Sequence, residues 1–183
     1  MGKEIVVLLG SPRKNGNSEQ LADALIKGAE RAGHRVTRIY ANDLDTGCCD
    51  CGGCYHTAEK PCCQHPDFNG IAQALLRADG IVLATPLYWY DMPGKLKSLI
   101  DNMYCFYITG KPLAHKRAAM ICCGHAEDYM MFDGVQRTFE LIVRAMNWSN
   151  AGQIYVPGVF RPGEVQSTDG MKRCEALGEH FFG

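Results

Sequence analysis

The stretch that decides the fold is EIVVLLGSPRKNGNS, residues 4–18. Its first six residues are nearly all apolar, as in a strand that is buried on both faces of a parallel sheet. Gly10-Ser11-Pro12 ends this strand, and Asn17 or Ser18 can cap the helix that follows. A buried strand, a polar loop and a helix in this order are the first unit of an alternating α/β fold.

Strand and helix patterns alternate along the rest of the chain. Further strands are expected at Arg35–Tyr40, Ile81–Ala84, Arg117–Cys123 and Gly152–Val156, and helices at 67–78, 93–104, 129–148 and 169–182. This alternation predicts a doubly wound five-stranded parallel sheet in the order 2-1-3-4-5, with helices on both faces. Ligands of such sheets bind beyond the carboxyl ends of strands one and three, where the strand order reverses.

Length and composition limit the class of protein. The 183 residues fit a single domain, 46% of them are apolar, and 19 basic residues nearly balance 20 acidic ones. General disorder and a nucleic-acid partner therefore have no support. No stretch reaches the roughly 20 apolar residues of a membrane span, and the first apolar run is too short for a signal peptide. We expect a cytoplasmic protein, in which cysteines more often serve metal or redox chemistry than form stable disulfides.

The loop after the first strand has the composition of a phosphate site. A polar loop that enters a helix presents unpaired N–H groups at the positive end of the helix dipole. Arg13 adds a cation suited to phosphate, and the side chains of Ser11, Asn15, Asn17 and Ser18 add donors. The loop matches neither the dinucleotide-binding pattern nor the Walker loop. A polar turn with an ordinary helix cap is the alternative.

An aromatic loop, Thr85–Gly94, follows the third strand. Tyr88, Trp89 and Tyr90 are consecutive there, and they could stack on a flat aromatic ligand and exclude water. The alternatives are a dimer contact or ordinary packing under the loop. The loop that begins at Gly124 would close the other side of this pocket.

Four stretches together resemble the NADPH-dependent FMN reductase family, whose members are flavodoxin-like. They are Gly10–Arg13 with Gly16–Ser18, Ala78–Ile81, Ala84–Trp89, and Pro93–Lys97 with Ile100-Asp101. The resemblance implies FMN as the cofactor and a homodimer or homotetramer, with the helix at 93–104 near the interface. It places the phosphate on Ser11, Arg13, Asn15, Gly16, Asn17 and Ser18, and the ring beside Thr85, Pro86, Leu87, Tyr88, Trp89 and Gly124.

The segment Asp43–Pro66 has no periodicity and holds six of the cysteines. Cys48, Cys51, Cys54 and Cys62 form C-x2-C-x2-C-x7-C, a compact set of thiolates that suits an iron–sulfur cluster. Structural zinc, a Cys51–Cys54 disulfide and free thiols are the alternatives. Cys49 and Cys63 are direct neighbours of the proposed ligands Cys48 and Cys62, so the identity of two of the four ligands is ambiguous. The remaining cysteines are expected in the core: Cys105, Cys122, Cys123 and Cys174.

This cysteine segment resembles that of the iron–sulfur flavoproteins, a branch of the same family, which implies a [4Fe-4S] cluster beside FMN. The function so predicted is an FMN-dependent, NAD(P)H-linked flavin or quinone reductase, with NADPH or NADH delivering hydride to the flavin. Small molecules or proteins would donate and accept the electrons. The alternatives are an electron-transfer or redox-sensing flavoprotein without NAD(P)H turnover, and a binding protein without redox work.

Overall fold

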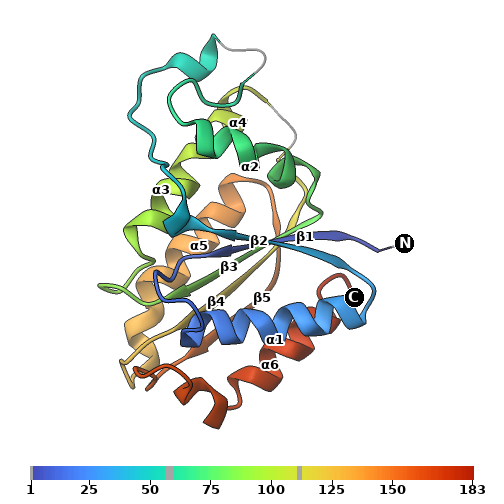
Figure 1. Cartoon of the computed structure of the whole chain (residues 1–183), viewed down its shortest axis with the longest axis vertical. Coiled ribbons are helices and arrows are strands. Elements are labelled where there is room, and N and C mark those ends of the chain that lie inside the picture. Colours follow the sequence, from blue (N-terminus) through green and yellow to red (C-terminus); the bar gives the residue numbers. More distant parts are fainter. Residues whose placement is uncertain (1, 57–59, 111–112) are drawn as a thin grey trace.

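The computed structural model of the chain describes residues 2–56, 60–110 and 113–183. Five parallel strands form one sheet in the order β2-β1-β3-β4-β5, which confirms the predicted topology (Figure 1). The strands are β1 (Glu4–Leu9), β2 (Arg35–Tyr40), β3 (Gly80–Pro86), β4 (Arg117–Cys123) and β5 (Ser149–Val156). Their carboxyl ends meet at one edge of the sheet, where a ligand site is expected.

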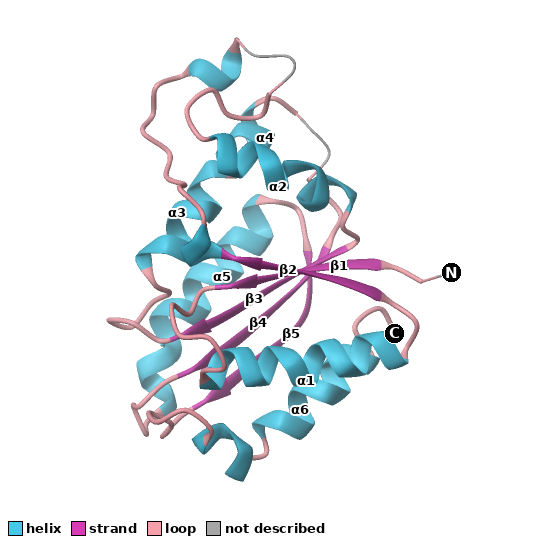
Figure 2. Ribbon diagram, viewed as in Figure 1, coloured by secondary structure: helices cyan, strands magenta, loops and turns pink. Residues whose placement is uncertain are grey.

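Helices cover both faces of the sheet (Figure 2). One face carries α1 (Asn17–Arg31) and α6 (Gly170–Glu179). The other carries α2 (Pro66–Arg77), α3 (Gly94–Asn102), α4 (Tyr104–Ile108) and α5 (Asp133–Ala145). Single 3-10 turns form at Ala41–Asp43, Gly53–Tyr55, Tyr129–Phe132 and Glu164–Ser167.

The central strand β1 explains the two cores. Ile5, Val7 and Leu9 pack under α1 and α6, while Val6 and Leu8 face the other helical layer. A strand with both faces buried needs apolar residues at successive positions, because neighbouring side chains point to opposite faces. This is the reason that residues 5–9 form an uninterrupted apolar run.

Helices α1 and α6 pack so closely that their contact requires glycine. A Cβ atom built on Gly28 would lie 2.0 Å from the Glu175 carbonyl oxygen, and one on Gly178 would lie 1.9 Å from that of Leu25. Only residues without a side chain permit this backbone approach. The pair therefore sets how closely α1 and α6 pack on each other.

Two helices differ from the sequence expectation. The single helix expected at 93–104 divides at Met103 into α3 and α4, because the chain turns there with ψ near −14°. The helix expected at 129–148 begins as a 3-10 turn, in which the Asp128 carboxylate accepts the Met130 N–H, and α5 ends at Ala145.

Strand β5 also begins earlier than expected, at Ser149 rather than Gly152. Ala118 pairs with Asn150 and Ala119 with Gly152, so Ala151 is an extra residue in a β-bulge. The bulge disrupts the apolar pattern by which the start of a buried strand is recognised.

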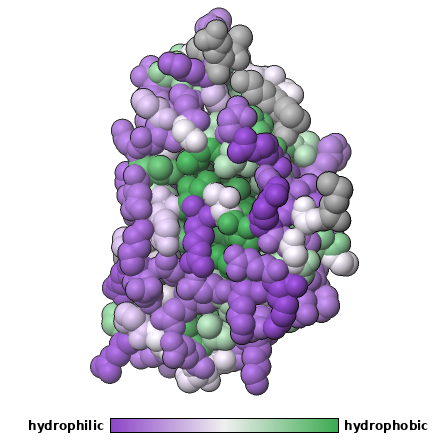
Figure 3. All heavy atoms as spheres, turned by 45° about the vertical axis from the view of Figure 1, so that its right-hand side comes forward, coloured by the Kyte–Doolittle hydropathy of each residue, from purple (hydrophilic) through white to green (hydrophobic). Residues whose placement is uncertain are grey.

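Hydrophilic side chains cover most of the face shown in Figure 3, around a band of apolar ones in its middle. Within the described ranges, no helix combines the length and the apolarity needed to cross a bilayer.

Candidate functional site

A pocket lies beyond the carboxyl ends of β1, β3 and β4, at the edge expected from the topology. The loops after these three strands meet there, as does the loop after β5. The lining residues are Ser11, Arg13, Asn17, Ser18, Pro86, Leu87, Tyr88, Cys123, Gly124, His125, Val159 and Phe160. We call this the strand-end pocket. It joins eight of the predicted cofactor-binding residues: Ser11, Arg13, Asn17, Ser18, Pro86, Leu87, Tyr88 and Gly124.

The phosphate side of this pocket is the start of α1. Gly16 is the N-cap residue, and no cap from a described side chain occupies the first-turn N–H groups. These groups and the helix dipole favour an anion. The Arg13 guanidinium lies 6.0 Å from the centre of the Phe160 ring, at the same pocket. A cation beside a helix N-terminus suits a phosphate ester.

Glu19 holds the loop that precedes α1. This carboxylate is 5% exposed, and it accepts the Asn15 N–H at 2.5 Å and the Tyr40 hydroxyl at 2.6 Å. Asn15 has φ of 56°, in the left-handed region, so the Glu19 contact secures a backbone shape that few residues adopt. The hydrogen bond to Glu19 raises the pKa of Tyr40.

Besides Trp89, three predicted cofactor-binding residues do not line the strand-end pocket. Asn15 and Gly16 shape the loop, and Thr85 is fully buried with its hydroxyl donating to the Pro86 carbonyl oxygen. Asn17 does line the pocket, but its side chain connects α1 to the last loop. Its amide donates to the Arg161 carbonyl oxygen and accepts the Gly163 N–H, both at 2.9 Å.

The aromatic loop is a tight hairpin. Tyr88 and Asp91 exchange backbone hydrogen bonds of 2.8 and 3.0 Å, and Trp89 and Tyr90 between them both have positive φ. The Asp91 carboxylate accepts a hydrogen bond from the Thr138 hydroxyl at 3.1 Å. Two consecutive non-glycine residues in the left-handed region store strain, which is typical of functional sites.

Trp89 does not line the strand-end pocket, contrary to the sequence expectation. Its side chain is 92% exposed and borders an adjoining hollow with Tyr88, Tyr90 and His125. Because Tyr88 and His125 also line the strand-end pocket, the hollow adjoins that pocket.

His125 belongs to the loop that the sequence placed on the far side of the strand-end pocket, whereas the sequence predictions missed Phe160 there. Their rings lie 5.4 Å apart in an edge-on arrangement. The Gly124 carbonyl oxygen accepts the Val159 N–H, which joins the loops after β4 and β5. An aromatic residue that follows a strand end was the available signal for Phe160.

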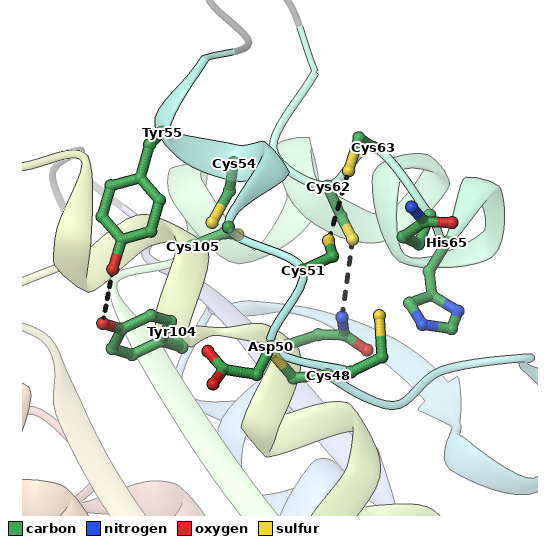
Figure 4. A pocket seen from close by; sticks show the side chains of 14 residues that line it. Cys48, Asp50, Cys51, Cys54, Tyr55, Cys62, Cys63, His65, Tyr104 and Cys105 are labelled. Carbon is green, nitrogen blue, oxygen red and sulfur yellow. Dashed lines mark hydrogen bonds between the residues drawn. The ribbon is translucent and has the colours of Figure 1, made fainter.

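The cysteine segment forms a second pocket, lined by all six of its cysteines (Figure 4). Cys105 of α4 lines it too, although the sequence placed this residue in the core and its side chain is buried. Among the described residues, no group of three or more His, Cys, Asp or Glu side chains is arranged to hold a metal ion. The structure therefore gathers the thiols without assembling a metal site.

Cys62 is held through its backbone and its sulfur by two asparagines, Asn69 and Asn102. Asn69 bonds both its N–H (2.9 Å) and its carbonyl oxygen (2.7 Å). The Asn102 amide donates to the Cys62 sulfur at 3.7 Å and accepts the Gly47 N–H at 2.6 Å. Since Asn102 is only 2% exposed, it fixes both ends of the segment from inside the molecule.

Cys51 contacts Cys63 rather than Cys54. The two sulfurs are 3.6 Å apart, and the Gly53 N–H together with the Cys63 thiol lowers the pKa of Cys51. The other core cysteines are buried as predicted: Cys122, Cys123 and Cys174. Burial raises the pKa of Cys123 to about 12, so this thiol stays protonated beside the strand-end pocket.

The two pockets share no lining residue among those described. Helix α3 runs between the strand-end edge and the cysteine segment (Figure 1). The two predicted cofactor sites are therefore lined by different residues of the chain.

Comparison with known proteins gives one family. Residues 4–148 match the family model described as NADPH-dependent FMN reductase. An iron–sulfur flavoprotein from Archaeoglobus fulgidus is 32% identical over 180 residues, covering 94% of this chain and 76% of that protein. One from Methanosarcina thermophila is 26% identical over 140 residues, covering 76% and 70%. An NAD(P)H:quinone oxidoreductase from Methanothermobacter marburgensis shares the fold, with a TM-score of 0.79, 18% identity, and coverage of 100% and 98%.

Proposed function

The chain belongs to the NADPH-dependent FMN reductase family, and from this premise we propose that it takes electrons from NADPH or NADH and passes them to a flavin- or quinone-type acceptor. The observation that carries the proposal is the strand-end pocket, where Arg13 and the open start of α1 face the aromatic and apolar wall of Leu87 and Tyr88. One end suits a phosphate and the other suits a flat ring.

The residues of this pocket fit FMN. When bound, FMN supplies hydride acceptance at its N5 atom, so this chain needs no acid, base or nucleophile of its own. Arg13, Ser11 and Ser18 would hold the phosphate, while Pro86 to Tyr88 and Gly124 would orient the ring. A Cβ atom on Gly124 would lie 3.0 Å from the Leu87 Cβ, so glycine keeps this side of the pocket open.

The adjoining hollow at Trp89, Tyr90 and His125 provides room for the second reactant. Exposed aromatic side chains there can stack on a nicotinamide or quinone ring and exclude water from it. We assign to this hollow the alternate binding of electron donor and acceptor.

We further propose that Cys48, Cys51, Cys54 and Cys62 hold a [4Fe-4S] cluster, which supplies one-electron transfer when bound. The donor set fits, because thiolates are the ligands of such clusters, and Asn102 offers a hydrogen bond to the Cys62 sulfur. The described side chains do not already surround one metal centre, so the thiols must move to admit a cluster. The names of two relatives support this proposal.

We propose that the protein is a cytoplasmic homodimer or homotetramer. A second copy would cover the exposed Trp89 hairpin, and it offers a route by which the cysteine pocket of one chain meets the strand-end pocket of another. An electron-transfer role without NAD(P)H turnover is the second candidate, because a cluster held by the cysteine pocket would be a redox centre separate from the flavin.

Steady-state oxidation of NADPH and NADH, with excess FMN or a benzoquinone as acceptor, tests the proposal. The reductase assignment predicts sustained turnover with at least one nucleotide, and Arg13→Ala should require more FMN for half-maximal rate. A flavin-loaded protein that neither nucleotide reduces would contradict the reductase assignment and favour the electron-transfer role.

A further inference from the structure

The proposed ligand set leaves Cys49 and Cys63 without a role, although both are exposed in the cysteine segment. Cys63 lies against one proposed ligand, with its sulfur 3.6 Å from that of Cys51. We propose that Cys51 and Cys63 form a disulfide when the cluster-free chain meets a peroxide. The Cys51–Cys63 pair is thus a site of oxidative modification, and formation of the disulfide does not depend on the proposed cluster.

Gly53 makes room for this contact. A Cβ atom built at position 53 would lie 2.1 Å from the Cys63 sulfur and 3.6 Å from the Cys51 sulfur. Any residue with a side chain would thus displace the Cys63 thiol. The glycine keeps the two sulfurs in contact across the 3-10 turn at Gly53–Tyr55.

The remaining separation is small. A disulfide bond is about 2.05 Å long, so the sulfurs must approach by roughly 1.5 Å, which side-chain rotation can provide in an exposed segment. Figure 4 shows the Cys51 sulfur directed toward Cys63, and the Cys54 sulfur directed toward Cys105. The geometry therefore favours Cys63 over Cys54, the partner suggested by the C-x-x-C spacing.

The reaction balances with hydrogen peroxide as the two-electron oxidant. The Cys51 thiolate attacks one peroxide oxygen, the O–O bond breaks, and a sulfenic acid and one water result after proton transfer. The Cys63 thiolate then attacks the Cys51 sulfur, so that the S–S bond forms, the S–O bond breaks and a second water leaves. Two thiols are oxidised and one peroxide is reduced.

This disulfide would exclude the proposed cluster, because Cys51 belongs to both. Oxidation of the cluster-free chain would then prevent cluster assembly until a reductant reopened the bond. This second consequence rests on the proposed function, whereas the disulfide itself does not.

The test uses the full-length chain, stripped of iron with a chelator, reduced, and exposed to hydrogen peroxide. An endoprotease that cuts after Asp and Glu separates residues 51–59 from residues 60–67, so only a disulfide joins these peptides. We expect the joined pair by mass spectrometry, a loss of two titratable thiols, and full reversal by dithiothreitol.

Single variants identify the partners. Cys63→Ser should abolish the joined peptides, while Cys54→Ser and Cys62→Ser should retain them. Peptides that stay joined in Cys63→Ser, or wild-type protein that keeps all its thiols in peroxide, would overturn the proposal. The peptide map of the wild-type chain decides the point even if a variant fails to fold.

Reconstitution with ferrous iron and sulfide distinguishes the two claims. If the reduced chain gains a cluster and the oxidised chain does not, both stand. A reduced chain that gains no cluster contradicts the proposed function and leaves the disulfide intact as a finding. An oxidised chain that gains a full cluster overturns the exclusion.

Discussion

Glu19 is a buried carboxylate in the first turn of α1, beside the place where we propose the phosphate of FMN. A negative charge there is unfavourable for an anion, and yet Glu19 makes two short hydrogen bonds to the loop and to Tyr40. We infer that its benefit is the shape of the loop, which keeps Arg13 and the helix N–H groups in position. Glu19 is thus a positioning residue.

Removal of the Glu19 carboxylate should weaken the binding of the FMN phosphate and leave the binding of the flavin ring unchanged. Glu19→Ala should weaken FMN binding by roughly tenfold, since a lost charged hydrogen bond costs about 1.5 kcal/mol. Riboflavin, which lacks the phosphate, should bind the variant as it binds the wild type. Flavin fluorescence titrations measure both constants, with Glu19→Gln as the conservative control that restores most of the FMN affinity. Equal losses for the two flavins would contradict this role.

Asn102 should tune the proposed cluster. Asn102→Asp keeps an acceptor for the Gly47 N–H but removes the donor to the Cys62 sulfur. Because hydrogen bonds to sulfur stabilise the reduced cluster, the reduction potential should fall. An electron paramagnetic resonance titration measures it, and the flavin potential serves as the internal control. An unchanged cluster potential would exclude the Asn102 contact in the loaded protein.

At the scale of elements, the α1–α6 contact gives a stability prediction whose sign is unusual. Alanine is normally better than glycine inside a helix by up to about 1 kcal/mol. Gly28→Ala should nevertheless destabilise the protein by about 1–3 kcal/mol, because the added methyl meets the Glu175 carbonyl oxygen. Urea unfolding measures the change.

Gly70→Ala in α2 is the matched control. A Cβ atom at Gly70 has no described atom within 4 Å, so this change should stabilise the protein by about 0.5–1 kcal/mol. Destabilisation by both variants, or by neither, would contradict the close packing of α1 on α6.

Asp79 connects β1 to the start of β3. Its carboxylate accepts the Glu4 N–H at 2.9 Å and pairs with Lys3 at 3.1 Å, and these contacts lower the pKa of Asp79 below 3.8. A lowered pKa in the folded state stabilises it at neutral pH, and this stabilisation is lost as the pH falls through the folded value.

Asp79→Asn should therefore cost about 1 kcal/mol at pH 7, the difference between a charged and a neutral hydrogen bond. The gap between variant and wild type should close as the pH falls below 3.8, the ordinary pKa of the group. Urea unfolding from pH 7 to pH 2.5 follows this gap. A gap that stays constant over that range would show that the Asp79 charge is not responsible.

Most helices and strands could be predicted, because burial of one or both faces imposes a regular spacing of apolar residues along each of them. The apolar runs at 5–9 and 118–123 needed no long-range knowledge, whereas α1 is capped by Gly16 and not by Asn17 or Ser18 as expected. The break at Met103 and the bulge at Ala151 could not be predicted, since both depend on packing between distant segments. The local sequence pattern determines whether a helix or strand forms, while tertiary contacts determine where it begins and ends.

The residues of the candidate site also divide into those that the sequence could predict and those that it could not. Loops that follow predicted strands brought Ser11, Arg13 and Tyr88 to one pocket, as parallel topology requires. Phe160 was missed, because the sequence shows a residue type and a neighbour but not the distant loop that it faces. Cys105 is buried in the core as predicted, and it also lines the cysteine pocket. Trp89 was assigned to the pocket by its position in the loop, although the hairpin turns it outward.

At the scale of the whole molecule, one chain carries two chemically distinct pockets at separate places. The proposed assembly predicts a dimer or a tetramer in solution, which sedimentation analysis measures. Trp89→Ala should shift this assembly toward smaller species, because the substitution removes a large exposed apolar side chain. A strictly monomeric wild-type protein would contradict the assembly.

The central claim is that this chain binds FMN in the strand-end pocket and an iron–sulfur cluster in the cysteine segment. The most direct test is the absorption spectrum of protein purified without oxygen, with FMN, iron and acid-labile sulfide counted per chain. We predict one FMN, four iron atoms and four sulfides, the composition of a single [4Fe-4S] cluster, and a broad absorption under the flavin bands that bleaches on reduction. A colourless protein that takes up no FMN would contradict the flavin assignment, and flavin bands without iron and sulfide would contradict the cluster.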